Sequence, residues 1–248
     1  MKRNPEVAAS LRRRELKDRS GVAAIVVAAG AGRRMGTKRE KVFVTLGGKP
    51  LLFYSLKALE VSPEIERVVI VVRKESLEEC REFVRRFRFK KVQAIVAGGK
   101  RRQDSVENGL RFVGESRFVL VHDGARPFLS RRLVSRTVAA CKRAGAAIAA
   151  LPVTDTLNRV SGGAIERTLP RENLWLVQTP QVFGKKIIED AFRRWPRRVT
   201  ATDDASMVKK SGKRVTVVEG DSFNIKVTFP GDLALAESLL RLNRRPWD

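Results

Sequence analysis

Short apolar runs alternate with segments of helical periodicity along the first three-fifths of the chain. The first of these runs, VAAIVVAA, has no polar face, which is typical of a parallel strand buried on both sides. We predict strands at residues 22–29, 67–72, 91–98, 117–127 and 144–153, the fourth ending in a loop. Helices are predicted at residues 50–62, 75–88, 103–113 and 130–143. This alternation predicts an α/β fold with a mostly parallel sheet and helices on both of its faces.

The pattern changes after Val153. Residues 154–170 alternate around Ser161-Gly162-Gly163, which predicts a β-hairpin that leaves the body as an arm. A strand at 173–183, a further helix, a strand at 214–220 and a helix at 231–243 complete the prediction. We expect one domain over residues 21–243, with the arm at about 154–172. Residues 1–20 are expected to form a basic extension outside the fold.

Composition excludes several classes of protein. Of the 248 residues 43% are hydrophobic, yet no apolar stretch approaches the roughly 20 residues needed to cross a bilayer. The glycine-arginine loop behind the first apolar run does not resemble a signal-peptide cleavage site. A single histidine excludes a histidine-based zinc site. The two cysteines are far apart and lack CxxC spacing, so we expect reduced structural thiols in a cytoplasmic protein.

The formal net charge of +24 predicts attraction to anions and a strong dependence on salt. The charge does not identify the anion. The cations are spread over many clusters and the chain has one tyrosine, which argues against a nucleic-acid-binding protein. A protein that binds RNA or a membrane surface remains an alternative, and it would require one continuous basic face.

The loop at residues 28–41, AAGAGRRMGTKREK, directly follows the first strand. Ligands of parallel sheets bind at the carboxyl ends of the strands. Gly30 and Gly32 permit positive φ angles and a nest of amides that binds anions, and Arg34 and Lys41 add positive charge. Together these residues suit a polyphosphate. A dinucleotide fingerprint fits badly, because Met35 replaces its third glycine and no acid ends the second strand.

Two further strand ends carry candidate chemistry. In GGKRRQDS (98–105) a glycine pair allows a flat ring to lie against the main chain, and Ser105 either binds phosphate or caps the following helix. In HDGARP (122–127), Asp123 beside Arg126 either handles metal or ribose, or forms a structural ion pair. We expect His122 to be a buried, neutral group with satisfied hydrogen bonds.

Seven stretches occur in a fixed order over about residues 22–240. They are AAGAGRRMG…K, GGKRRQDSV, VHDGARPF, PVTDT, LWLVQTPQVF, TDDAS and NIKVTFPGDLALAE. The chain thereby resembles the 2-C-methyl-D-erythritol 4-phosphate cytidylyltransferases of the non-mevalonate isoprenoid pathway. The resemblance implies a Rossmann-like sheet and a β-arm that builds a homodimer. It also implies transfer of CMP from CTP to methylerythritol phosphate with release of pyrophosphate, assisted by Mg²⁺ or another divalent cation.

The resemblance also implies roles for individual residues. The residues implied in catalysis are Arg34, Lys41, Lys226 and Asp123, the last also as a metal ligand. Those implied in binding CTP are Ala28, Ala29, Gly30, Gly32, Gly99 and Ser105. Those implied in binding the acceptor are Arg126, Thr156, Arg171, Thr179 and Thr202, with Thr156 and Arg171 reaching the neighbouring subunit's site.

Two positions depart from the family pattern. Glu40 stands where proline usually precedes the lysine of the first loop, and Lys100 stands where an acid often follows the glycine pair. An acid beside a triphosphate is unfavourable unless it points away. A cytidylyltransferase for another polyol phosphate, such as ribitol 5-phosphate, remains the nearest alternative, because a methyl group is worth only about 1–3 kcal/mol in a pocket.

Overall fold

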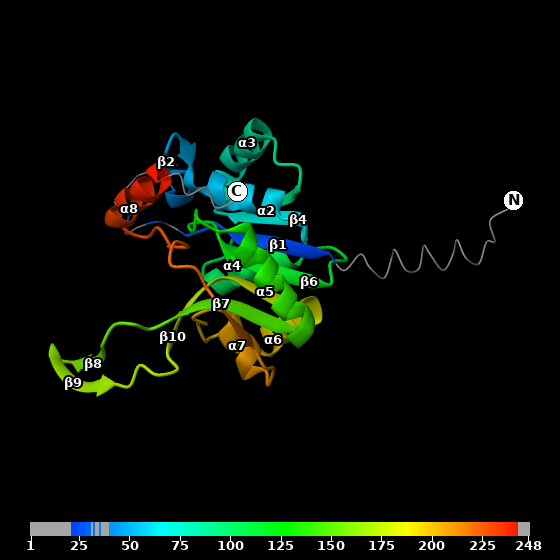
Figure 1. Cartoon of the computed structure of the whole chain (residues 1–248). Helices are drawn as coiled ribbons and strands as arrows, with labels where there is room; N and C mark the ends of the chain where they lie inside the picture. Colours follow the sequence, from blue (N-terminus) through cyan, green and yellow to red (C-terminus); the bar gives the residue numbers. More distant parts are fainter. Residues whose placement is uncertain (1–20, 31, 33–34, 36–39, 243–248) are drawn as a thin grey trace, which may run out of the picture.

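The computed structural model describes residues 21–30, 32, 35 and 40–242. Its centre is a seven-stranded sheet in the order β11-β7-β10-β6-β1-β4-β5 (Figure 1). The strands are β1 (Val22–Val27), β4 (Ile65–Val72), β5 (Val92–Ala97), β6 (Phe118–Asp123), β7 (Ala146–Pro152), β10 (Trp175–Gly184) and β11 (Thr216–Glu219). Only β10 runs antiparallel to its neighbours within this sheet. The predicted mostly parallel α/β sheet is confirmed.

Helices cover both faces of the sheet, because successive strand residues point to opposite sides. Val26 and Ile70 pack into one buried cluster, and Ile25 and Val69 into the other. The first cluster is completed by α2 (Leu51–Val61), α3 (Leu77–Phe87), α5 (Arg131–Ala144) and α8 (Pro230–Arg241). The second is completed by α4 (Arg102–Leu110), α6 (Lys185–Arg194) and α7 (Asp204–Lys210). No helix among these described residues is long and apolar enough to span a membrane.

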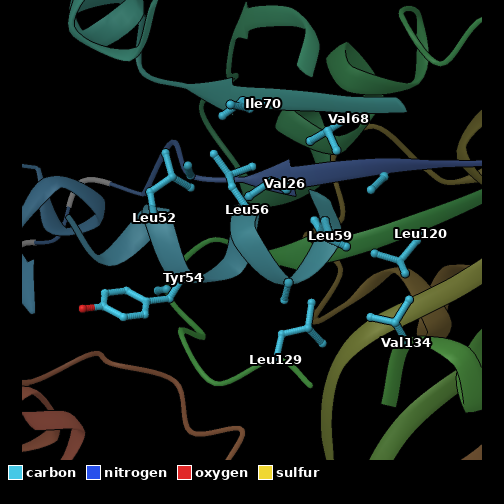
Figure 2. Packing of buried hydrophobic residues seen from close by; sticks show 14 of the residues in the cluster. Val26, Leu52, Tyr54, Leu56, Leu59, Val68, Ile70, Leu120, Leu129 and Val134 are labelled. Atoms are coloured by element: carbon cyan, nitrogen blue, oxygen red, sulfur yellow. The ribbon is translucent and has the colours of Figure 1, made fainter. Parts of the chain in front are cut away.

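Helix α2 lies at the centre of the first cluster (Figure 2). Pro50 directly precedes the helix with a φ of −58°, which is suited to a helix start. Leu52, Leu56 and Leu59 then point toward the sheet, where Val26 and other buried side chains meet them. All three leucines are fully buried, and each contributes about 1.5–3 kcal/mol of hydrophobic stabilisation.

Short elements connect these layers. The turn between the first strand and α2 contains the 3₁₀ helix η2 (Lys41–Phe43) and a small ladder of β2 (Thr45–Leu46) with β3 (Lys49–Pro50). A second 3₁₀ helix, η3 (Lys74–Ser76), joins β4 to α3. The ladder was not predicted, because two-residue strands leave no periodic signal.

The predicted hairpin arm is present. Strands β8 (Leu157–Ser161) and β9 (Ala164–Leu169) pair antiparallel and project from the body (Figure 1). Gly162 and Gly163 have φ angles of 57° and 82°, which the two central positions of a type I′ turn require. Val160 and Ile165 are 57% and 66% exposed, so the arm presents apolar side chains to its surroundings.

Helix α4 approaches the sheet most closely at Gly109. A Cβ atom there would lie 2.7 Å from Cγ2 of Ile25 and 3.1 Å from Cγ2 of Val71. In α8, by contrast, a Cβ on Gly231 would have no neighbour within 4 Å.

We therefore predict that Gly109→Ala lowers the free energy of unfolding by about 1–3 kcal/mol through overpacking. Gly231→Ala is the matched control, and it should leave stability unchanged or raise it by up to about 1 kcal/mol. Urea unfolding of both variants measures the difference. Equal stabilities of the two variants would contradict the close approach of α4 to β1 and β4.

Candidate functional site

The strand order reverses direction at β1. The chain moves outward from β1 to β4 and β5, and then returns to place β6 on the other side of β1. At the carboxyl end of this pair, Val27 lies opposite Asp123. Ligands of open parallel sheets bind at such a switch point.

A cleft of about 930 Å³ opens at this switch point. Residues from all three predicted strand-end loops and from the segment after β11 line it. Those predicted from the sequence are Ala28, Ala29, Gly30, Gly32, Lys41, Gly99, Ser105, Asp123 and Lys226. The structure therefore brings most of the predicted site residues into one cavity, with Arg73, Lys74, Lys100 and Arg102 as additional cations. Arg34 lies outside the described residues.

The first loop is built on tight backbone geometry. Gly32 has a φ of 60°, and a Cβ atom on it would lie 3.0 Å from Cβ of Lys41. A glycine is thus required both by the backbone conformation and by the close approach of the lysine. The buried Met35 donates its amide to the carbonyl of Gly32 over 2.8 Å, which holds this end of the loop against the core.

The second loop is packed equally tightly. A Cβ on Gly98 would lie 2.4 Å from Cβ of Ala29, so the two loops touch. Ser105 accepts a hydrogen bond from the amide of Gly99 at 3.1 Å and donates to the carbonyl of Arg101 at 3.2 Å. The N-cap of α4 is Arg101, not Ser105, so the capping alternative for this serine is wrong. Phosphate binding by Ser105 stays a prediction.

Asp123 is the centre of the charge in the cleft. Its carboxylate accepts from Nζ of Lys226 at 2.7 Å and from Nε of Arg102 at 3.2 Å. Nε of Arg126 lies 4.0 Å away. Burial by itself raises the pKa of Asp123, but the charges of Arg102 and Lys226 outweigh it and hold the pKa well below its usual range. The site therefore contains a permanent carboxylate outnumbered by cations.

Arg102 and Asp204 were not predicted as site residues. Nη1 of Arg102 donates to Asp204 at 2.8 Å, so this arginine connects Asp123 on β6 to the start of α7. Burial lowers the pKa of Arg102, but the two aspartates outweigh that effect and raise it. Two features of the sequence could have pointed to these residues. Arg102 follows closely on the glycine pair at the end of a strand, and Asp204 is one of the two adjacent acids in TDDAS.

A buried hydrogen-bond chain supports Asp123 from below. Its amide donates to Oγ1 of Thr179 at 3.1 Å, and Oγ1 lies 3.0 Å from Nδ1 of His122. Nε2 of His122 lies 3.3 Å from the carbonyl of Arg126. Because the amide only donates and the carbonyl only accepts, the threonine donates to Nδ1 and the histidine carries its proton on Nε2. Burial lowers the pKa of His122 to about 4, which confirms a neutral, satisfied histidine.

The remaining predicted acceptor residues make their contacts outside the lining of the cleft. Arg126 donates to the carbonyl of Asn224 at 2.7 Å, while its Nε is buried without a hydrogen-bond partner among the described residues. Thr202 is exposed just before α7. Thr156 and Arg171 are exposed at the base of the arm, where Arg171 donates to the carbonyl of Thr154. The lining of the cleft includes none of the predicted acceptor residues Arg126, Thr156, Arg171, Thr179 and Thr202.

The described part of the chain has no group of three or more histidine, cysteine or acidic side chains placed to hold a metal ion. Cys80 and Cys141 are buried free thiols, as predicted, and burial raises the pKa of each to about 12. Neither thiol is therefore a nucleophile at neutral pH.

The family model for 2-C-methyl-D-erythritol 4-phosphate cytidylyltransferase matches residues 22–242. The chain belongs to this family. A cytidylyltransferase of this name from Dehalococcoides mccartyi is 46% identical over 224 residues, covering 90% of this chain and 97% of the relative. One from Halalkalibacterium halodurans is 41% identical over 222 residues, covering 89% and 97%.

Solved structures of cytidylyltransferases of this family have the same fold. The Thermus thermophilus 2-C-methyl-D-erythritol 4-phosphate cytidylyltransferase is 37% identical with a TM-score of 0.74, covering 89% of this chain and 99% of that one. The 4-diphosphocytidyl-2C-methyl-D-erythritol synthase of Anaerococcus prevotii has a TM-score of 0.79 at 28% identity, covering 90% and 97%.

The hydrogen-bond chain below Asp123 generates a prediction for this cytidylyltransferase. With a folded pKa of about 4 against 6.5 for the unfolded chain, His122 binds its proton only in the unfolded state between these pH values. The free energy of unfolding should therefore fall by up to roughly 3 kcal/mol as the pH drops from 6.5 to 4.

Urea unfolding at a series of pH values measures this slope, and His122→Gln provides the comparison. The variant should lose the part of the slope due to the histidine, while the carboxylates contribute equally to both proteins. Parallel stability curves for the two proteins would disprove the burial of a neutral His122.

Proposed function

We propose that the chain transfers a cytidylyl group from CTP to 2-C-methyl-D-erythritol 4-phosphate. The chain is a cytidylyltransferase of the family that it matches, so the reaction class follows from membership. An oxygen of the acceptor phosphate forms a bond to the α-phosphorus of CTP. The bond between that phosphorus and the bridging oxygen breaks, and its electron pair leaves on pyrophosphate. The products are 4-diphosphocytidyl-2-C-methyl-D-erythritol and pyrophosphate.

The charge arrangement around Asp123 is the observation that carries this proposal. A phosphate monoester has a second pKa near 6, so its oxygens are already nucleophilic at pH 7 without a general base. The obstacle is repulsion between two polyanions, because unit charges about 4 Å apart interact by about 4 kcal/mol at an effective dielectric of 20. A cleft in which Lys41, Arg102 and Lys226 outnumber Asp123 supplies the compensating charge.

On the nucleotide side, the glycine loops and the cations have separate roles. Gly30, Gly32 and Gly99 let backbone amides approach CTP. Ser105 accepts a hydrogen bond from the amide of Gly99 and so holds the second loop in place. Lys41 and Arg34 neutralise the triphosphate. Lys226 stabilises the charge that develops at the reacting phosphorus, because such a donor acts most strongly in the transition state.

Ala28 and Ala29 complete the CTP-binding set, and their small side chains leave room for the base. Both residues line the cleft directly after β1. Ala29 packs so closely against Gly98 that the two loops are in contact beside this position. Lys100, which also lines the cleft, takes the place where an acid is common, and we assign it to the nucleotide phosphates.

The acceptor side is completed by a second subunit. Arg126 and Thr202 serve the acceptor from the same chain, while Thr179 holds Asp123 in place. Nε of Arg126 lies 4.0 Å from Asp123 and makes no hydrogen bond among the described residues, so it retains a donor for the acceptor. Thr156 and Arg171 belong to the arm and reach the partner's acceptor. The exposed apolar residues Val160 and Ile165 support a homodimer formed through the arm, since such surface is normally covered.

A divalent cation, Mg²⁺ in our proposal, fits this site. Mg²⁺ is usually held by one or two carboxylates together with substrate phosphates. Asp123 supplies such a carboxylate, and each of its oxygens retains acceptor capacity beside its protein partner. When bound, the cation would neutralise phosphate charge. We place the enzyme in the cytoplasm, in accord with its two unpaired buried thiols.

Two measurements test the proposal directly. The melting temperature is measured with CTP, ATP, UTP or NADPH, each with and without Mg²⁺. Of the four nucleotides, only CTP should raise it. Steady-state assays with methylerythritol phosphate and ribitol 5-phosphate should favour the former. A shift with NADPH, or turnover of ribitol phosphate alone, would overturn the assignment.

We predict that Lys226→Ala lowers kcat by about 10²-fold or more, the range for a lost transition-state donor. Lys142→Ala is the matched control, because it removes the same charge from an exposed position on α5. Steady-state kinetics with both substrates measure the effect. Similar kcat values for the two variants would remove Lys226 from the reacting centre.

We also predict that Arg171→Ala raises the KM for the acceptor more than the KM for CTP, because the side chain is assigned to the acceptor alone. Arg143→Ala, an exposed arginine at the end of α5, should change neither. Analytical ultracentrifugation controls for loss of the dimer. Equal effects on both KM values would exclude the acceptor role.

A further inference from the structure

Glu40 is an acid placed next to Lys41 in a loop that binds anions. An uncompensated carboxylate there would repel the triphosphate. The structure turns this side chain out of the cleft: Lys41 lines the cavity and Glu40 does not. The Glu40 side chain is only 9% exposed, so the carboxylate is turned inward. The neighbouring residues of the loop are rich in cations.

The carboxylate of Glu40 contacts the end of β4. Its Oε1 lies 3.5 Å from Nε of Arg73, the residue directly after that strand, and the same Nε lies 3.5 Å from Glu75. The side chain of Ser76, in η3, also hydrogen-bonds the Glu40 carboxylate. Its Oε2 is buried without a hydrogen-bond partner among the described residues. A buried carboxylate with one unsatisfied oxygen contributes little to stability. We therefore explain the contact between Glu40 and Arg73 by the residue that it positions, because its contribution to folding stability is small.

The residue that it positions is Lys41. The carbonyl of Glu40 accepts from the amide of Phe43 at 2.9 Å, which begins η2. Val42 and Phe43 are buried in the core. Lys41 is thus held between a packed anchor on one side and the ion pair with Arg73 on the other, with its Cβ against Gly32.

We propose that Glu40 is a positioning residue that clamps the first loop to Arg73 and so directs Lys41 at the CTP triphosphate. This inference rests on the proposed use of CTP. The backbone of Glu40 has a φ of −59°, the value that a proline ring imposes. Among the described residues the Glu40 amide donates no backbone hydrogen bond. A proline would therefore fit at position 40, where its ring would restrict the backbone. In this chain the ion pair between Glu40 and Arg73 restricts the loop instead.

Three variants test the clamp. Glu40→Ala should weaken CTP binding, measured by calorimetry without acceptor, by about tenfold, the equivalent of one lost charged contact. Glu40→Pro should restore binding to within about threefold of the parent, because the ring fixes the same φ angle. Glu78→Gln is the control, since it removes an acid that pairs with Arg81 at the exposed start of α3.

A double-mutant cycle identifies the residue through which Glu40 acts. In a Lys41→Ala background, Glu40→Ala should produce no further loss of CTP affinity. Thermal unfolding of each variant confirms that it is folded. Equal affinities of Glu40→Ala and the parent, a Glu40→Pro variant as weak as Glu40→Ala, or additive losses in the cycle would each overturn the clamp.

Failure of the clamp is distinguishable from failure of the proposed function. If the parent protein does not turn over CTP, the function is wrong. If the parent turns over CTP and the variants bind it equally well, only the clamp is wrong.

Discussion

The rest of the site depends on how one buried carboxylate is neutralised. Asp123 ends β6 in the middle of the sheet, where an unpaired charge would cost several kcal/mol. Its partners come from two distant segments, the start of α4 and the segment after β11. Both segments must therefore dock on β6 before the charge is satisfied. The cleft is therefore complete only when both segments are packed at the end of β6.

This arrangement also explains how the site stays charged without its substrates. The cations would repel one another if they gathered in an empty cleft. Asp123 holds Lys226 and Arg102 in place and leaves a net positive charge to attract phosphates. The Arg102 contact with Asp204 extends the same network to the start of α7, two residues after Thr202 in the chain. In the proposed reaction, these contacts of Asp123 fix the cations before substrate binds, which lowers the reorganisation needed during reaction.

Much of this could be read from the sequence because strand ends converge in a parallel sheet. The apolar runs located β1, β4, β5 and β6, and the residues after them supplied most of the cleft. Pairings between distant segments could not be read in this way. Arg102 and Asp204 are far apart in the chain, and nothing local indicates that they meet. The direction of β10 was equally hidden, because burial on both faces hides the alternation that marks an antiparallel strand.

Residues outside the lining of the cleft were harder still to place. From the sequence alone, the hydroxyl of Thr179 could bind any nearby ligand. In the structure it donates to Nδ1 of His122 and accepts from the backbone amide of Asp123. Glu40 is a departure from the family pattern whose meaning depends on the direction of its side chain. That direction is set by contacts with Arg73, directly after β4, and with Ser76 in η3. The roles proposed for Thr156 and Arg171 involve a second subunit, so they depend on contacts that lie outside a single chain.

The net charge of +24 has to be weighed against the few cations that line the cleft. At physiological ionic strength the Debye length is about 8 Å, so exposed arginines on outer helices contribute little at the reacting phosphorus. Several of them are also paired along their own helices, as Arg194 is with Asp190. Lys41, Arg102 and Lys226 act at short range in a partly desolvated cavity, where screening is weak. The overall charge therefore draws polyanions toward the molecule, and the local arrangement decides which of them react.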